Sequence, residues 1–267
     1  MAKRRAIRRL GASRRVGLID ELRGILILGV VIYHLLYDLT AIYGVRIPIF
    51  GASWVGLIRD IGAGSFIFIS GAMSMFSRSN FKRGALCLLC GFGLTLVTWL
   101  VMPEQLILFG ILHLLGVCML LFAVFGRLVE RIPWGIGLLL ALALFALTKD
   151  VTAGRIGLQG LFSWPLPEVL YSTKYLFFLG LPGPGLPASA DYYPLLPWVF
   201  LFFAGSHFGK PLREGSFPDG MYQTRFRSFA FLGKHTIWIY LLHQPVLIGV
   251  LELVFRLKEQ LSKGLPF

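Results

Sequence analysis

Long runs of apolar residues constrain this chain more than any other feature of its sequence. They recur along most of its 267 residues, separated by short breaks such as SRSNFKRG and MPEQ. A helix needs roughly 20 apolar residues to cross a hydrocarbon core about 30 Å thick, and the runs approach that length. With 56% hydrophobic and 15% charged residues, the chain also lacks the amphipathic spacing of a soluble domain. The pattern predicts an all-α integral membrane protein, a single polytopic bundle.

We expect about seven transmembrane helices, or eight if residues 149–191 contain a further span. The expected spans are 24–43, 60–77, 84–102, 106–125, 134–148, 192–209 and 235–255. Proline-rich residues 149–191 favour an extracytoplasmic loop with a re-entrant or interfacial helix. A full span over 166–182 would instead move the C-terminus to the cytoplasm. The predicted organisation is a basic cytoplasmic tail over 1–18, a transmembrane domain over 19–258 and a C-terminal tail over 259–267.

Basic residues predict the orientation of the chain and account for its net charge of +13. Seven Lys or Arg residues precede the first apolar run in MAKRRAIRRLGASRR, which is typical of a cytoplasmic flank. That run is too long for a signal-peptide core, so we expect it to be retained as a helix. With the N-terminus inside, cytoplasmic segments hold 18 of the 26 Lys and Arg residues. We expect a multi-pass protein of the plasma (inner) membrane, and nothing in the sequence indicates a nucleic-acid partner.

The cysteines do not indicate a metal or redox site. Cys87 and Cys90 form a C-x-x-C inside an apolar run, without a second pair or a nearby ligand histidine, and Cys118 lies in another run. Buried thiols in membrane helices explain this pattern better than metal ligands do. The sequence has no H-E-x-x-H or paired C-x-x-C metal site, so we expect no metal. It also has no phosphate-binding glycine loop and no G-x-S-x-G elbow.

Polar residues in the first apolar run, RGILILGVVIYH, are the strongest candidates for chemistry. At about 100° per residue, Arg23 and His34 share one helix face, and at about 1.5 Å per residue they lie roughly 16 Å apart. Asp38 follows on the same face at the i+4 spacing. The stripe suits a ligand whose anionic head meets Arg23 while its reactive end reaches an imidazole that Asp38 orients. Arg23 as an interfacial anchor, with His34 and Asp38 as a structural interhelical pair, explains the spacing equally well.

Other polar groups within the apolar runs have local structural explanations. His113 lies among glycines that allow close helix packing, and His243 immediately precedes Gln244 and Pro245. Trp54 is typical of the aromatic belt at a membrane interface. We retain four residues as weaker candidates for substrate binding: His113, His243, Trp54 and Asp191.

The segment IDELRGILILGVVIYH resembles the first helix of the transmembrane acyltransferase superfamily, in which Arg and His are separated by ten residues. Four further stretches resemble bacterial members of the heparan-α-glucosaminide N-acetyltransferase-like family. They are ASWVGLIRDIGAGSFIFISGA, FGILHLLGV, DYYPLLPWVFLFFAG and LGKHTIWIYLLHQPVL. The resemblance runs from about residue 16 to 250 and covers nearly the whole chain.

This resemblance implies a membrane enzyme that takes an acetyl group from cytoplasmic acetyl-CoA and gives it to a sugar amine or hydroxyl. His34 matches the catalytic histidine of the superfamily and Arg23 the arginine before it. Lysosomal members carry asparagine where His34 stands, and carry the histidine assigned to acetyl transfer where Gly51 stands. This chain lacks a histidine at position 51. Either His34 acts alone, as in the wider superfamily, or the mechanism and acceptor have diverged. The CoA phosphates would meet Arg23 and a set of inner-face cations, namely Arg78, Lys82, Arg83 and Arg127.

Two other function classes remain open at this stage, and so does a homodimer. A proton-coupled transporter would use histidine and aspartate within the membrane as a relay, although no inverted repeat is visible in the sequence. A non-catalytic membrane protein could use the same scaffold, because fold does not dictate function.

Overall fold

The computed structural model describes residues 15–263; the first 14 residues of the predicted basic tail, and residues 264–267, lie outside that range. The chain forms two compact units, which we describe separately. Of the described residues, the terminal unit combines 15–66 with 218–263, and the central unit spans Ile67–Phe217. Helix α3 (Ser53–Ser74) contributes to both units, with the division at residue 67.

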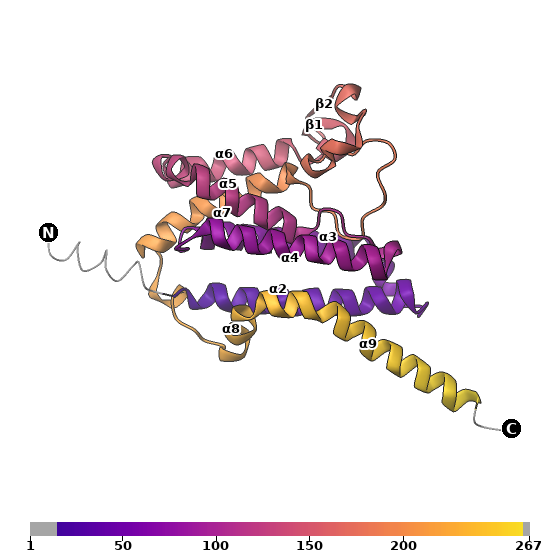
Figure 1. Cartoon of the computed structure of the whole chain (residues 1–267). Helices are drawn as coiled ribbons and strands as arrows, with labels where there is room; N and C mark the ends of the chain where they lie inside the picture. Colours follow the sequence, from indigo (N-terminus) through magenta and orange to yellow (C-terminus); the bar gives the residue numbers. More distant parts are fainter. Residues whose placement is uncertain (1–14, 264–267) are drawn as a thin grey trace. The chain divides into compact units, whose positions relative to one another are not determined.

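The terminal unit is built on α2 (Gly17–Tyr37), which continues into a π-helical turn, η1 (Asp38–Ile42). Two helices from the other end of the sequence pack on α2, namely α8 (Arg227–Lys234) and α9 (Thr236–Lys263) (Figure 1). Short 3₁₀ turns η2 (Pro48–Gly51) and η7 (Asp219–Met221) complete the unit. Helix α9 therefore extends into the predicted C-terminal tail.

Glycines bring α2 and α8 into backbone contact. A side chain at Gly24 would collide with the Phe229 carbonyl, and one at Gly233 would collide with the Asp20 carbonyl. Close approach through small residues is a common way for membrane helices to associate. The buried Glu21 carboxylate accepts hydrogen bonds from the backbone N–H groups of Arg225 and Phe226, the latter at 2.8 Å. These bonds satisfy donors at the start of α8, as a capping side chain does.

The central unit contains the end of α3 and four more long helices, α4 (Asn80–Val101), α5 (Ile111–Arg131), α6 (Trp134–Leu147) and α7 (Leu195–Glu214). The 3₁₀ turn η3 (Pro103–Gln105) joins α4 to α5, and these two helices pack antiparallel. Gly84 faces the Gly116 carbonyl across that contact. Between α3 and α7, Gly71 and Gly205 allow a similarly close approach. Small residues thus bring helices together in this unit as well.

Residues 149–194 form a compact connection without an α-helix. A two-stranded antiparallel hairpin pairs β1 (Arg155–Leu158) with β2 (Phe162–Pro165). Three 3₁₀ segments accompany it, η4 (Val151–Ala153), η5 (Glu168–Tyr171) and η6 (Lys174–Leu179). At about 2 Å per residue, the six residues of η6 cover roughly 12 Å, which is too short for a bilayer core. This fully described segment therefore supplies neither an eighth span nor a re-entrant α-helix.

All seven predicted spans correspond to helices, although several boundaries shift by up to eight residues. Six helical segments among residues 15–263 are long and apolar enough to cross a membrane. They are Gly17–Ile42, Ser53–Ser74, Asn80–Val101, Ile111–Arg131, Trp134–Ala153 and Thr236–Leu261. The all-α membrane class is confirmed, but the count of seven is not. The remaining helix, α7, ends in a polar turn with Lys210 and Arg213 and contains Pro211.

Candidate active site

Histidines from two helices meet in the terminal unit. His34 lies in the last turn of α2 and His243 in the second turn of α9. Their ring centroids are 4.9 Å apart with an interplanar angle of 61°, an edge-on arrangement. Both side chains are half-buried. Two residues separated by 209 positions in the sequence thus form one pair, which we call the histidine pair.

A buried carboxylate lies one turn beyond His34. Asp38 is fully buried, and both of its side-chain oxygens accept hydrogen bonds from Nε2 of Gln244, at 2.8 and 3.0 Å. Asp38 begins the π-helical turn, a distortion that frequently occurs at functional sites. The Asp38–Gln244 bond joins the same two helices as the histidine pair. The partner of the Asp38 carboxylate is thus the Gln244 amide. The predicted orientation of the His34 ring by Asp38 stays a prediction.

The local sequence of α9 positions the His243 ring. Pro245 has no backbone N–H, so the regular hydrogen bonding of α9 is interrupted next to His243, at the Leu241 carbonyl. Nδ1 of His243 donates a hydrogen bond to the Tyr240 carbonyl at 2.7 Å, because a carbonyl oxygen can only accept. The ring is therefore held by its own helix on one side. On the other side it faces His34.

A third contact joins Tyr43, the residue directly after the π-helical turn, to α9. The Tyr43 hydroxyl donates to Glu252 at 3.2 Å, and its ring stacks on Phe255 at a centroid distance of 4.5 Å. Arg256 forms an ion pair with Glu252 at 2.6 Å. Together with the two pairs above, this contact fixes α9 along α2 at three successive levels.

Arg23 lies three turns before His34 on the same helix. Helix α2 is unbroken from Gly17 to Tyr37, so the two residues share a face and are roughly 16 Å apart. The Arg23 side chain is half-buried.

Trp54, in the first turn of α3, is 49% exposed, which suits an outer surface of the bundle.

The other predicted cations belong to the central unit. Arg78 lies between α3 and α4, Lys82 and Arg83 lie in the first turn of α4, and Arg127 lies near the end of α5. Because α4 and α5 are antiparallel, these four residues lie at the same end of that helix pair. They therefore form one basic end of this helix pair, and their predicted contact with CoA phosphates stays a prediction.

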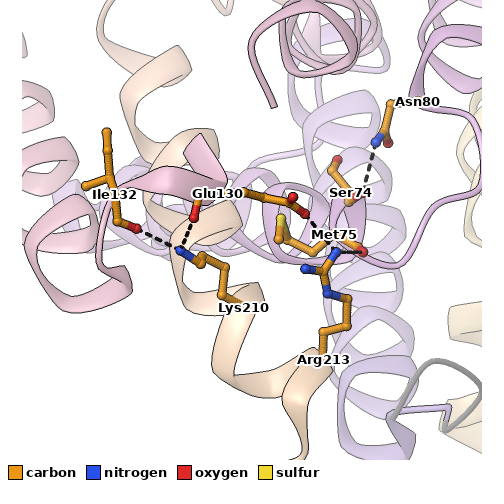
Figure 2. A network of polar contacts seen from close by, with 7 residues as sticks. All are labelled: Ser74, Met75, Asn80, Glu130, Ile132, Lys210 and Arg213. Carbon is orange, nitrogen blue, oxygen red and sulfur yellow. Dashed lines mark hydrogen bonds and ion pairs between the residues drawn. The ribbon is translucent and has the colours of Figure 1, made fainter. Parts of the chain in front are cut away.

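Two further cations near this end bind the protein itself. Figure 2 shows Lys210 between the carbonyls of Glu130 and Ile132, to which Nζ donates at 2.8 and 2.7 Å. Arg213 donates to the Met75 carbonyl at 3.2 Å and to the Glu130 carboxylate at 3.0 Å (Figure 2). Carbonyls at helix C-termini lack intrahelical partners, and these cations satisfy them. The structure thus assigns Lys210 and Arg213 to holding helix ends together.

His113 and Asp191 act together at the start of α5. Nδ1 of His113 accepts from the Gly110 N–H at 3.2 Å, and Nε2 lies 3.3 Å from the Thr95 hydroxyl. Asp191 accepts from the Ile111 N–H at 3.1 Å. Both side chains therefore satisfy backbone donors of a helix N-terminus. Their predicted contact with substrate stays a prediction.

The fold and site define a class of protein, a polytopic helical membrane protein with a histidine pair between its first and last long helices. Residues 15–245 match the family described as heparan-α-glucosaminide N-acetyltransferase, catalytic. The chain belongs to this family, which confirms the family resemblance and implies an acyltransferase. Comparison with curated proteins and with solved structures gives no significant match.

Sequence reasoning missed Gln244 as a site residue. Its contact with Asp38 depends on how α9 packs on α2, across 206 positions of sequence. A signal was nevertheless present, because a polar HQP triplet interrupts an otherwise apolar run. Polar residues in a membrane helix usually face other polar groups, and two such interruptions in separate helices can be tested as partners.

Proposed function

We propose that this chain is a membrane-embedded acetyltransferase that moves an acetyl group from cytoplasmic acetyl-CoA to a hydroxyl or amine. The acceptor would be an envelope carbohydrate or a similar small molecule. The protein would lie in the plasma membrane with its N-terminus in the cytoplasm. The observation that carries this proposal is the His34 imidazole, placed between helices in a chain that belongs to an acetyltransferase family. Histidine is the side chain most often used for general acid–base catalysis.

In the proposed reaction His34 removes a proton from the acceptor as its nitrogen or oxygen attacks the thioester carbonyl. The carbon–sulfur bond then breaks, and the CoA sulfur takes this proton from His34 and leaves as the free thiol. In a two-step variant, His34 attacks first and carries the acetyl group as an acetyl-imidazole. Gly51 has no side chain to offer as an alternative base, so the imidazole chemistry falls to histidines of the α2–α9 contact.

Binding of the donor is assigned to cations at the inner face. Arg23 lies about 16 Å from His34, a separation of the same order as the pantetheine arm that links the CoA phosphates to the thioester. Guanidinium groups suit phosphates because their planar donors form paired hydrogen bonds. Phosphate binding by Arg78, Lys82, Arg83 and Arg127, which belong to the central unit, is a separate part of the proposal that rests on the family resemblance. Lys210 and Arg213 are left out of this set because they already bind the protein.

The test is acetyl-CoA binding and CoA release by the purified full-length protein in detergent. We expect the wild type to bind acetyl-CoA and release CoA, His34→Ala to bind without turnover, and Arg23→Ala to bind more weakly. His235→Ala is a matched control, because His235 is exposed and its ring bonds to the local Phe231 carbonyl. Absence of both binding and CoA release in the wild type would overturn the proposal. A proton-coupled flux in vesicles without CoA would then favour a transporter.

A further inference from the structure

The hydrogen bonding of His243 fixes where its proton lies. Nδ1 donates to the Tyr240 carbonyl, so in the neutral ring the lone pair is on Nε2. This Nε2 atom is buried and has no hydrogen-bond partner among residues 15–263. A buried nitrogen without a partner costs free energy unless something binds to it. Nε2 therefore has a lone pair available to accept a hydrogen bond from a neighbouring donor.

The neighbour of His243 is the imidazole that the proposed function uses as a base. The ring centroids of His34 and His243 are 4.9 Å apart. Two imidazoles joined by one hydrogen bond of about 2.9 Å would have a closely similar centroid separation. A small rotation of His34 would therefore bring one of its nitrogens to Nε2 of His243.

We propose that His243 is a second acid–base residue of the acetyl transfer, and that its Nε2 holds the proton which His34 takes from the acceptor. This inference rests on the proposed function and adds a residue and a proton route to it. His34 would no longer carry the charge alone, because the proton is shared between two rings. Sharing lowers the cost of a positive charge in a poorly solvated site.

The step balances without a further reactant. The acceptor forms a bond to the acetyl carbon and loses one proton, which passes to His34 and then to Nε2 of His243. The carbon–sulfur bond breaks with its electron pair going to sulfur. The proton returns through His34 to this thiolate, giving free CoA and two neutral imidazoles. No net charge enters or leaves the site.

Asp38 and Gln244 act as positioning residues for this pair. Gln244 follows His243 in the chain, and its amide donates to both oxygens of the buried Asp38. Since His34 and Asp38 lie one turn apart on α2 and η1, the bond fixes α9 in the register that places one imidazole beside the other. The contact between Tyr43 and Glu252 supports the same register.

The decisive variant is His243→Asn in the full-length protein in detergent. An asparagine amide can still donate to the Tyr240 carbonyl, but it has no nitrogen that accepts a proton at the Nε2 position. Using acetyl-CoA hydrolysis, with water as the acceptor, we expect kcat to fall by about 100-fold, within the usual range for an acid–base group. The Kd for acetyl-CoA should stay within about twofold. His235→Asn is the matched control and should retain the wild-type kcat.

A second variant separates proton transfer from packing. His243→Ala opens a space beside His34, and added imidazole should raise its kcat by about tenfold if a missing acid–base group caused the loss. Failure of imidazole to raise kcat in a variant that still binds acetyl-CoA would overturn the inference. So would a kcat for His243→Asn within about threefold of wild type, and in that case the proposed function would stand. An inactive wild type would instead remove the proposed function and this inference with it.

Discussion

Two histidines of this protein, His113 and His243, lie in membrane helices beside aromatic or imidazole rings, yet their surroundings differ. His113 is 1% exposed and both of its ring nitrogens have partners within the central unit. Because the Gly110 N–H donates to Nδ1, the proton of the neutral ring is on Nε2, and it points to Thr95. His243 has one bonded nitrogen and one buried nitrogen without a partner among residues 15–263. Satisfied imidazoles stabilise a fold, whereas an unsatisfied one can bind a proton or a substrate.

The largest expected effect is that of His34→Ala, which removes the proposed base. Because acid–base groups contribute about 10²–10⁴-fold to rate, kcat for CoA release should fall by at least 100-fold. Isothermal titration should show acetyl-CoA binding within about twofold of wild type. Retention of wild-type kcat would place the reactive base elsewhere. The difference in surroundings between His113 and His243 would then say nothing about catalysis.

Arg23→Ala should mainly weaken donor binding. Hydrogen bonds to charged groups contribute about 1.5–3 kcal/mol, so we expect the Kd of acetyl-CoA to rise by roughly 10- to 100-fold. The kcat at saturating acetyl-CoA should change much less, and Arg23→Lys should restore part of the affinity. A fall in kcat with an unchanged Kd would contradict the assignment of Arg23 to the CoA phosphates.

Asp38→Ala tests whether the position of His243 relative to His34 matters. It removes the hydrogen bonds that hold α9 in place while leaving both imidazoles in the chain. Loss of an interhelical hydrogen bond in a membrane protein costs about 1–2 kcal/mol, so thermal unfolding in detergent should begin at a lower temperature. We expect kcat to fall by about tenfold as the histidine pair loses its spacing.

The matched control is Asp38→Ala combined with Gln244→Ala, which removes both partners of the bond. Because no buried amide is then left unpaired, the double variant should be less destabilised than the sum of the single ones. Strict additivity would show that the two side chains do not interact.

The smallest expected effect on catalysis is that of His113→Ala. Loss of its two buried hydrogen bonds should lower the free energy of unfolding by about 1–3 kcal/mol, because the Gly110 N–H is left unpaired. The kcat per folded molecule should change far less than in His34→Ala. A loss of kcat with unchanged thermal stability would show that His113 contacts the substrate after all.

The helices of the bundle could be predicted from the sequence because apolar runs of bilayer length leave few alternatives. Helix α8 was missed, since Arg227–Lys234 is short and its packing depends on Gly24, far away in the sequence. The number of spans was also uncertain for a physical reason, because the polar end of α7 and the 3₁₀ turns of residues 149–191 give ambiguous hydropathy.

Single residues of the candidate site could be predicted, but their pairing could not. Arg23, His34 and Asp38 lie on one helix, so their spacing follows from helix geometry alone. The contacts of His34 with His243 and of Asp38 with Gln244 require the packing of α9 on α2, which no local pattern specifies. The same holds for His113, whose role as a helix cap depends on the fold of residues 106–111.

The most direct test of this account measures kcat for CoA release from acetyl-CoA by His34→Ala, His243→Asn and His113→Ala, purified in parallel with the wild type. We expect losses of about 100-fold or more for the first two variants, and a change of less than about threefold per folded molecule for the third. Wild-type rates in His34→Ala and His243→Asn beside an inactive His113→Ala would contradict it, and would place the reaction at the start of α5.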